Sequence, residues 1–150
     1  MQKPGLLAGL LSILQKEDDM SDQNTAETLA GLIQWLRERH DRIMAVEAEA
    51  LRLLESGNTP GHNAKMREKA EMLAALGEDA KPLLAGLPGE LRFNLALALE
   101  RFSGSARNAL GLNSVFYMSA LLYPEAHKQG EPDDLTVCID RVEREGENFS

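Results

Sequence analysis

The feature that most constrains this chain is an uninterrupted helical pattern between Asn24 and Gly57. Apolar residues recur along it at alternating spacings of three and four residues, the repeat of a helix that packs against other helices. Arg39 is the one polar residue on this apolar seam. A helix of this length would reach on the order of 45–50 Å, which predicts an elongated bundle or a surface made for another helix. The seam consists of Leu29, Leu32, Leu36, Ile43, Val46, Ala50 and Leu53.

Local signals mark the predicted ends of this helix. Asn24, with Glu27 three residues later, forms a capping-box-like pair at its start. Gly57 suits the left-handed residue that closes a helix, and Pro60 follows where a second helix would begin. Such a tight reversal predicts an antiparallel helical hairpin. Gly77 is expected to interrupt the second helix.

More helices follow, and no strand pattern occurs before residue 134. A third helix is predicted from about Pro88 to Phe102. Beyond it, the small residues 103–105 would either break the helix or mark a close crossing inside a longer one. The segment that ends before Pro124 is apolar almost all round and is expected to be the most buried. The sequence therefore predicts an all-α fold: an elongated up-and-down bundle of four to five helices with one long first helix.

The predicted organisation has three parts. Residues 1–19 form a short apolar N-terminal helix or an extension, residues 20–124 form the bundle, and residues 125–150 form an acidic C-terminal arm. Within the arm, an apolar island has the spacing of a short helix that Asp133 or Asp134 could cap, although its β-branched content would equally permit a strand. The island contains Leu135, Ile139 and Val142.

Composition excludes several classes of function. The formal net charge of −8 argues against nucleic acid and against anionic membrane surfaces, both of which attract clustered basic residues. No apolar run approaches the roughly 18 residues that span a bilayer, so membrane insertion is not expected. A single cysteine, Cys138, allows no internal disulfide and gives no sign of an oxidising compartment. We expect a cytoplasmic protein.

No constellation of residues predicts catalysis, a metal site or a cofactor. A di-iron bundle needs Glu-x-x-His on two helices, and His40 has no acidic residue at that spacing. His62 and His127 fall in predicted turns. Cys138 has acidic surroundings, which disfavour a reactive thiolate.

The most specific cluster is aromatic and lies between Val115 and Tyr123. One interpretation is that it forms the core of the last bundle helix. The other is that one side of it makes an apolar groove, covered by the tail helix when idle and occupied by a partner's amphipathic helix when bound. The candidate partner-binding residues are Trp35, Phe116, Tyr117, Leu121, Leu122, Tyr123, Leu135, Ile139 and Val142.

Residues 47–51 (Glu-Ala-Glu-Ala-Leu) precede the Gly57-Asn58 turn, and the second helix that follows carries Lys65 and Lys69. A later apolar helix carries two asparagines, Asn108 and Asn113. In these features the chain, from Leu29 to about Leu122, resembles the FlgN-type flagellar export chaperones. The resemblance implies an acidic cytoplasmic chaperone whose clients are hook-associated filament proteins, with client contacts in the C-terminal region.

The function that we predict is therefore non-catalytic: capture of an amphipathic helix of a client protein by a secretion or flagellar export chaperone. Two alternatives remain open. One is a metal-dependent helical-bundle enzyme. The other is a structural or adaptor module that forms a homodimer by pairing the first helix with its own copy.

Overall fold

The computed structural model describes the backbone of residues 4–149 and the side chains of residues 22–148. This part of the chain contains helices and no strand, which confirms the predicted all-α fold. The elements are α1 (Pro4–Glu55), α2 (Thr59–Leu84), α3 (Gly89–Gly111), α4 (Val115–Ala120), α5 (Asp134–Gly146) and the 3₁₀ turn η1 (Glu147–Phe149).

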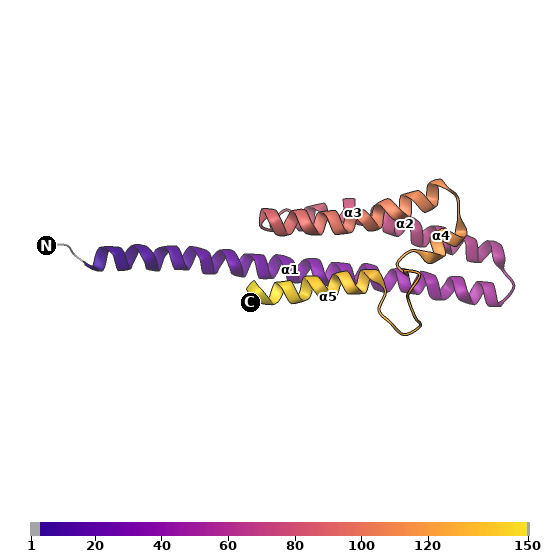
Figure 1. The fold of residues 1–150 in the computed structure, drawn as a ribbon, viewed down its shortest axis with the longest axis horizontal. Helices are drawn as coiled ribbons and strands as arrows, with labels where there is room; N and C mark the ends of the chain where they lie inside the picture. Colours follow the sequence, from indigo (N-terminus) through magenta and orange to yellow (C-terminus); the bar gives the residue numbers. More distant parts are fainter. Residues whose placement is uncertain (1–3, 150) are drawn as a thin grey trace.

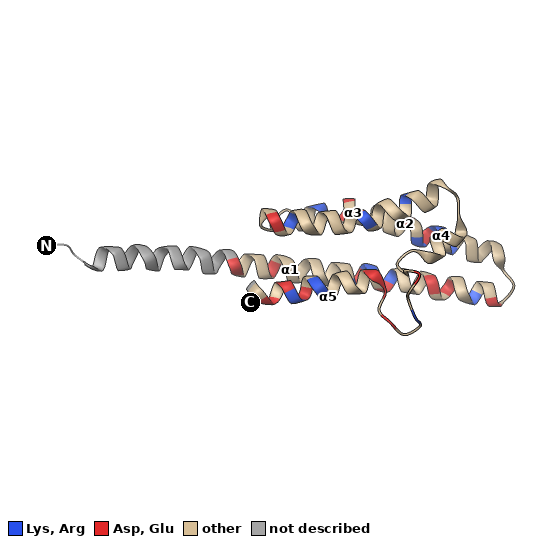
Figure 2. Ribbon diagram, viewed as in Figure 1, with Lys and Arg blue, Asp and Glu red and all other residues tan. Residues whose placement is uncertain are grey.

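The helices form an elongated up-and-down bundle (Figure 1). α2 returns along α1, α3 reverses direction again, and α5 runs back along α1 after the short α4 and a loop. The predicted bundle with a long first helix is confirmed. Acidic and basic residues are spread over all the long helices in the part whose side chains are described (Figure 2).

The predicted seam of α1 forms the centre of the hydrophobic core. Five of its seven residues are at most 1% exposed. Four of them pack with leucines of α2, α3 and α5, and Ala50 belongs to a second buried cluster with Met66, Ala70, Ala109 and Met118. Among the residues whose side chains are described, Arg39 has no acidic partner. Its guanidinium group lies 5.0 Å from the ring centroid of Trp35, in a cation–π contact. The fully buried seam residues are Leu29, Leu32, Leu36, Ile43 and Ala50.

The predicted start of the first helix is wrong. Asn24 lies inside α1, which already includes Asp22 and Gln23, so Asn24 and Glu27 do not form a cap. A local capping pattern does not prevent a helix from running through it. The prediction of a separate apolar helix in residues 1–19 concerns side chains outside the described part.

The turn between α1 and α2 agrees with the prediction. Gly57 has φ = +83°, a conformation that favours glycine. Asn58 caps α2, since its side-chain oxygen accepts a hydrogen bond of 2.9 Å from the backbone N–H of Gly61.

The expected interruption of the second helix at Gly77 does not occur, because α2 continues through Gly77 and Pro82. Instead, Gly77 marks a close crossing with α3. The Ser103 hydroxyl accepts a hydrogen bond from the Gly77 N–H and donates one to the Leu73 carbonyl, both 2.9 Å long. Of the two possibilities for residues 103–105, the small-residue crossing inside one longer helix is the one observed.

The apolar island of the C-terminal arm is a helix, α5, capped by Asp133. The Asp133 side chain accepts hydrogen bonds from the N–H groups of Leu135 and Thr136. α5 packs along α1 in antiparallel register. Asp133 meets His40 at its start, and a Cβ built on Gly146 would lie 3.6 Å from Leu29 at its end.

The segment before Pro124 is not the most buried element, contrary to expectation. α3 ends at Gly111, and Asn113 (φ = +50°) turns the chain into the six-residue α4. Met118 is fully buried on α4, whereas Phe116 is 74% and Tyr117 is 53% exposed. A continuous helix predicted from apolar content alone misses this turn.

Candidate functional site

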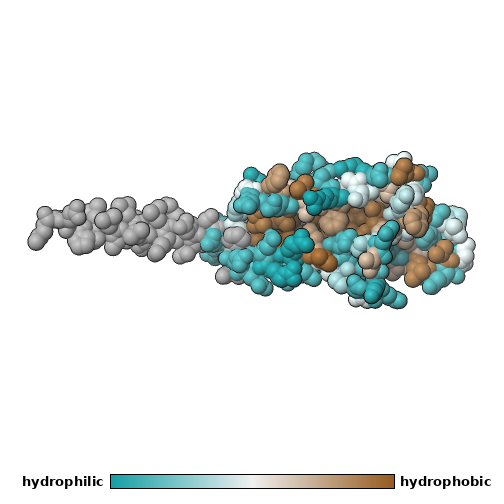
Figure 3. All heavy atoms as spheres, in the orientation of Figure 1, coloured by the Kyte–Doolittle hydropathy of each residue, from teal (hydrophilic) through white to brown (hydrophobic). Residues whose placement is uncertain are grey.

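One concave feature of the described part is a groove between α3 and α5. Its volume is about 350 Å³. Figure 3 shows apolar surface exposed in the middle of this face, between the positions of α3 and α5 in Figure 1. We call this feature the α3–α5 groove. It is lined by Ala98, Arg101, Phe102 and Ser105 from α3 and by Asp134, Val137, Cys138 and Arg141 from α5.

The groove exists because the described helices do not close around it. α1 packs extensively against α2 and α5, and α2 packs against α3. α3 and α5 do not pack extensively against each other, although both contribute to the common core. In a closed four-helix bundle each helix has two long neighbours. Here, the sides of α3 and α5 that face each other have no described helix packed against them.

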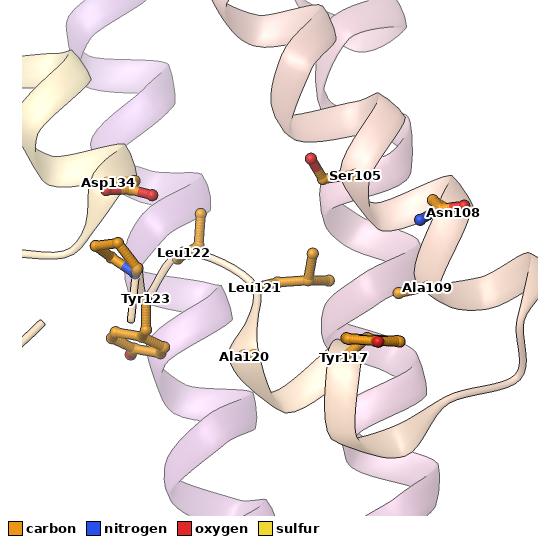
Figure 4. A pocket seen from close by; sticks show the side chains of 10 residues that line it. Ser105, Asn108, Ala109, Tyr117, Ala120, Leu121, Leu122, Tyr123 and Asp134 are labelled. Atoms are coloured by element: carbon orange, nitrogen blue, oxygen red, sulfur yellow. The ribbon is translucent and has the colours of Figure 1, made fainter. Parts of the chain in front are cut away.

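A second cavity, of about 330 Å³, continues the groove towards α4. Ser105 and Asp134 line both cavities, so the two cavities lie side by side. Figure 4 shows Tyr117 and Leu121 beside Ala109 of α3. We call it the α4 pocket. Its lining residues are Ser105, Asn108, Ala109, Tyr117, Ala120, Leu121, Leu122, Tyr123, Pro124 and Asp134.

Exposed apolar side chains border both cavities. The Phe116 and Tyr117 rings pack edge to face with centroids 5.7 Å apart. Val137, on the wall of the α3–α5 groove, is 39% exposed. Because exposed apolar surface gains free energy when it is covered, this face is suited to an apolar partner.

A buried ion pair fixes the wall of the α4 pocket. The side chain of Lys69 is fully buried, and its Nζ lies 2.8 Å from Oε1 of Glu47. The same Nζ donates hydrogen bonds to the carbonyls of Ser119 (3.0 Å) and Leu121 (2.9 Å). Tyr123 donates a 2.5 Å hydrogen bond to the other oxygen of Glu47. α1 and α2 thus hold the connection that follows α4.

The environment of this cluster shifts two pKa values. Burial lowers the pKa of Lys69, and the neighbouring Glu47 carboxylate only partly opposes that shift. The pKa of Tyr123 is raised well above its usual range, first by burial and then by its hydrogen bond to Glu47. The contacts of Lys69, Glu47 and Tyr123 join α1 and α2 to α4 and the residues after it, and we assign the cluster a structural role.

A second polar cluster joins α5 to α1. Nε2 of His40 lies 2.7 Å from Oδ2 of Asp133, and the Thr136 hydroxyl donates a 2.9 Å hydrogen bond to the same oxygen. Burial raises the pKa of Asp133, but the hydrogen bonds from His40 and Thr136 outweigh it and the net shift is downward.

The structure brings together part of the predicted site. Tyr117, Leu121, Leu122 and Tyr123 all line the α4 pocket, and Phe116 lies next to it against Tyr117. Leu122 has φ = +78°, which is rare for a leucine. This strained residue lies where the chain leaves the pocket.

The other predicted residues lie elsewhere. Leu135, Ile139 and Val142 are at most 1% exposed and belong to the core beneath α5. Trp35 is partly buried, packs against that core and lines neither cavity. The tail helix was expected to cover the aromatic cluster between Val115 and Tyr123. Instead, α5 packs along α1 and forms one wall of the α3–α5 groove.

Sequence reasoning missed the residues of the α3–α5 groove. Val137 and Arg141 are four residues apart on α5 and lie on a different side from its buried residues. The groove depends on two helices that are distant in sequence, and a periodic pattern on either helix does not show the space between them.

The histidines have partners other than a metal. His62 bonds the side chain of Asn63, and His127 bonds the backbone carbonyl of Glu131. Among the residues whose side chains are described, no group of three or more His, Cys, Asp or Glu residues is arranged to hold a metal ion. No helix in the same part of the chain has the length and hydropathy needed to cross a membrane.

The fold and the groove define the chain as an all-α helical bundle with an open apolar face. Comparisons with protein families, with curated proteins and with solved structures found no match.

Proposed function

We propose that this chain is a non-catalytic helix-binding protein that receives an amphipathic helix of a client in the α3–α5 groove and the adjoining α4 pocket. The observation that carries the proposal is the space between α3 and α5, which is bordered by exposed apolar side chains and filled by no described helix. A bound helix would complete the bundle and cover that surface, which is the helix-in-groove mode of recognition.

The resemblance to the FlgN-type chaperones leads us to propose a more specific role. In that role the protein acts in the cytoplasm and holds an aggregation-prone helix of a secreted filament protein until export. The net charge of −8 supports it, because excess charge keeps a protein and its bound client soluble.

Homodimerisation through the α1 seam is a weaker candidate. Leu29, Leu32, Leu36 and Ile43 are buried inside the same chain, so the seam is not open to a second copy. Metal-dependent catalysis has no supporting cluster among the described side chains.

Cys138 allows a direct test, since the only cysteine of the chain is half-buried on the groove wall. The probe is a synthetic amphipathic helix of about 18 residues, with leucines along one stripe and glutamines elsewhere. Binding in the groove should slow alkylation of Cys138 by iodoacetamide. A peptide of identical composition, with its leucines scattered around the helix, should not protect the thiol.

Two substitutions locate the binding surface. Val137→Glu should weaken peptide binding, because it places a charge in the groove. Phe93→Ser removes an exposed apolar side chain of α3 (66% exposed), which faces α2 and lies outside the groove. This control substitution should leave binding unchanged. Equal effects of the two substitutions, or no protection of Cys138 by the striped peptide, would refute the proposal.

A further inference from the structure

Two arginines stand on opposite walls of the α3–α5 groove. Arg101 projects from α3 and Arg141 from α5, and both are exposed. Within the described part of the chain neither of them forms an ion pair, so both guanidinium groups are open to a ligand. The third charged residue of the groove lining is Asp134, at the end shared with the α4 pocket. Cations therefore outnumber carboxylates in the groove, although the net charge of the chain is −8.

We propose that the groove selects an amphipathic helix of another protein whose apolar stripe is flanked by Asp or Glu on both sides, with Arg101 and Arg141 binding these carboxylates. This inference rests on the proposed function and adds the chemistry of the partner.

The geometry of a docked helix supports this arrangement. Its apolar stripe would lie on Ala98, Phe102 and Val137, which lie on the two walls of the groove. The positions that flank the stripe then face α3 on one side and α5 on the other, and each side meets one arginine. A guanidinium group binds a carboxylate through two parallel hydrogen bonds. An acidic residue on each side of the stripe can therefore bind the arginine on the wall that it faces.

Long-range electrostatics makes the opposite prediction, which gives the proposal a sharp test. If the net charge of −8 decided the preference, a helix flanked by lysines would bind best. Only a local effect of the groove arginines would favour the acidic helix. Because exposed ion pairs are weak, we expect a gain in affinity of about two- to fivefold for each arginine.

The test uses three synthetic helices with the same leucine stripe, flanked by Glu, Gln or Lys, and measures their affinities for the full-length protein by fluorescence anisotropy. The wild-type protein should bind the Glu peptide best, then the Gln peptide, then the Lys peptide. The double variant Arg101→Glu/Arg141→Glu should reverse this order. The control Arg92→Glu/Arg144→Glu carries the same change in net charge at two exposed positions outside the lining of this groove, and should keep the wild-type order.

The outcomes separate this inference from the proposed function. If the Gln peptide binds and protects Cys138 but the arginine variants do not alter the order, helix capture stands and the acidic selectivity is refuted. The same holds if the control variant reverses the order as strongly as Arg101→Glu/Arg141→Glu. If no peptide binds, both proposals fail. Protection of Cys138 that instead rises with protein concentration, together with a dimer in light scattering, would assign the groove to a second copy of this chain.

Discussion

Lys69 is the residue on which the α4 pocket depends most directly. It is fully buried, yet its ammonium group is surrounded by oxygens from α1, from α4 and from the residue that follows α4. Burying a charge is costly unless its partners replace water. Here Glu47 and the carbonyls of Ser119 and Leu121 replace it.

Replacing Lys69 should therefore destabilise the protein strongly. Lys69→Met leaves the partly buried Glu47 without its counter-ion, so we expect a loss of about 3 kcal/mol in the free energy of unfolding, measured by urea denaturation. The control is Lys65→Met, which breaks an exposed pair with Glu68 on the same helix and should cost less than about 1 kcal/mol. Similar losses in the two variants would show that the buried pair has no special role.

Asp133 predicts a specific dependence of stability on pH. Its pKa is lower in the folded protein than its usual value of 3.8. As the pH falls to about that usual value and below it, Asp133 takes up a proton more readily in the unfolded chain than in the folded protein. The stabilisation is therefore complete above the unfolded pKa and is lost as the pH falls through the folded pKa. Between pH 5 and pH 2.5, Asp133→Asn should show a shallower loss of stability than the wild type in urea denaturation, and Asp134→Asn should follow the wild type.

At the scale of elements, α2 and α3 cross closely at Gly77 and Ser103. Gly77 lets Ser103 approach the α2 backbone. There the Ser103 hydroxyl bonds both the Gly77 N–H and the Leu73 carbonyl, two groups that normally bond each other in a helix. A Cβ built on Gly77 would lie 2.8 Å from Oε2 of Glu100 and 3.2 Å from the Ser103 oxygen.

Two glycine-to-alanine substitutions test this crossing. Gly31 lies inside α1 with nothing within 4 Å of an added Cβ, so Gly31→Ala should stabilise the protein by up to about 1 kcal/mol through helix propensity. Gly77→Ala has the same propensity gain, but the Ser103 hydroxyl must move and weaken its hydrogen bonds. We expect it to be at least about 1 kcal/mol less stable than Gly31→Ala in thermal unfolding. Equal stabilisation by both substitutions would contradict the close crossing.

The elements also show which features could be predicted from sequence. The α1 seam, the left-handed Gly57 and the Asp133 cap are local patterns, and the structure confirms each of them. The buried Lys69 could not be recognised, because the carbonyls that it binds lie about 50 residues further along the chain. The prediction of a longer buried helix in place of α4 is wrong, since apolar content does not distinguish a core residue from an exposed apolar residue such as Phe116.

At the scale of the whole molecule, α5 acts as the last side of the core. Its residues Leu135, Ile139 and Val142 share one buried cluster with the N-terminal half of the α1 seam. The predicted acidic arm is therefore part of the bundle in this structure, and it also supplies one wall of the groove.

Removing α5 should change the association state of the protein. A chain that stops after Glu131 would expose Leu29, Leu32 and Leu36 as a continuous apolar stripe, and such a stripe promotes association. We expect light scattering to show dimers or larger species, while circular dichroism retains the signal of the remaining helices. The 150-residue chain with Val137→Glu, a change on the groove-facing side of the same helix, should scatter as the wild type does. A shortened chain that scatters identically to the full-length protein would contradict this role of α5.

Because α5 packs antiparallel to α1, the force needed to detach it should depend on the end from which it is pulled. Tension applied at the Gly146 end would peel the helix from α1 one contact at a time, first beside Leu29, then at the ion pairs of Arg37 with Asp140 and Glu143, and last at His40 and Asp133. Tension applied at the other end of α5 would begin with the cluster of short polar contacts around Asp133. In an optical trap, α5 should therefore detach at lower force when it is pulled from its last turn than when it is pulled from its first.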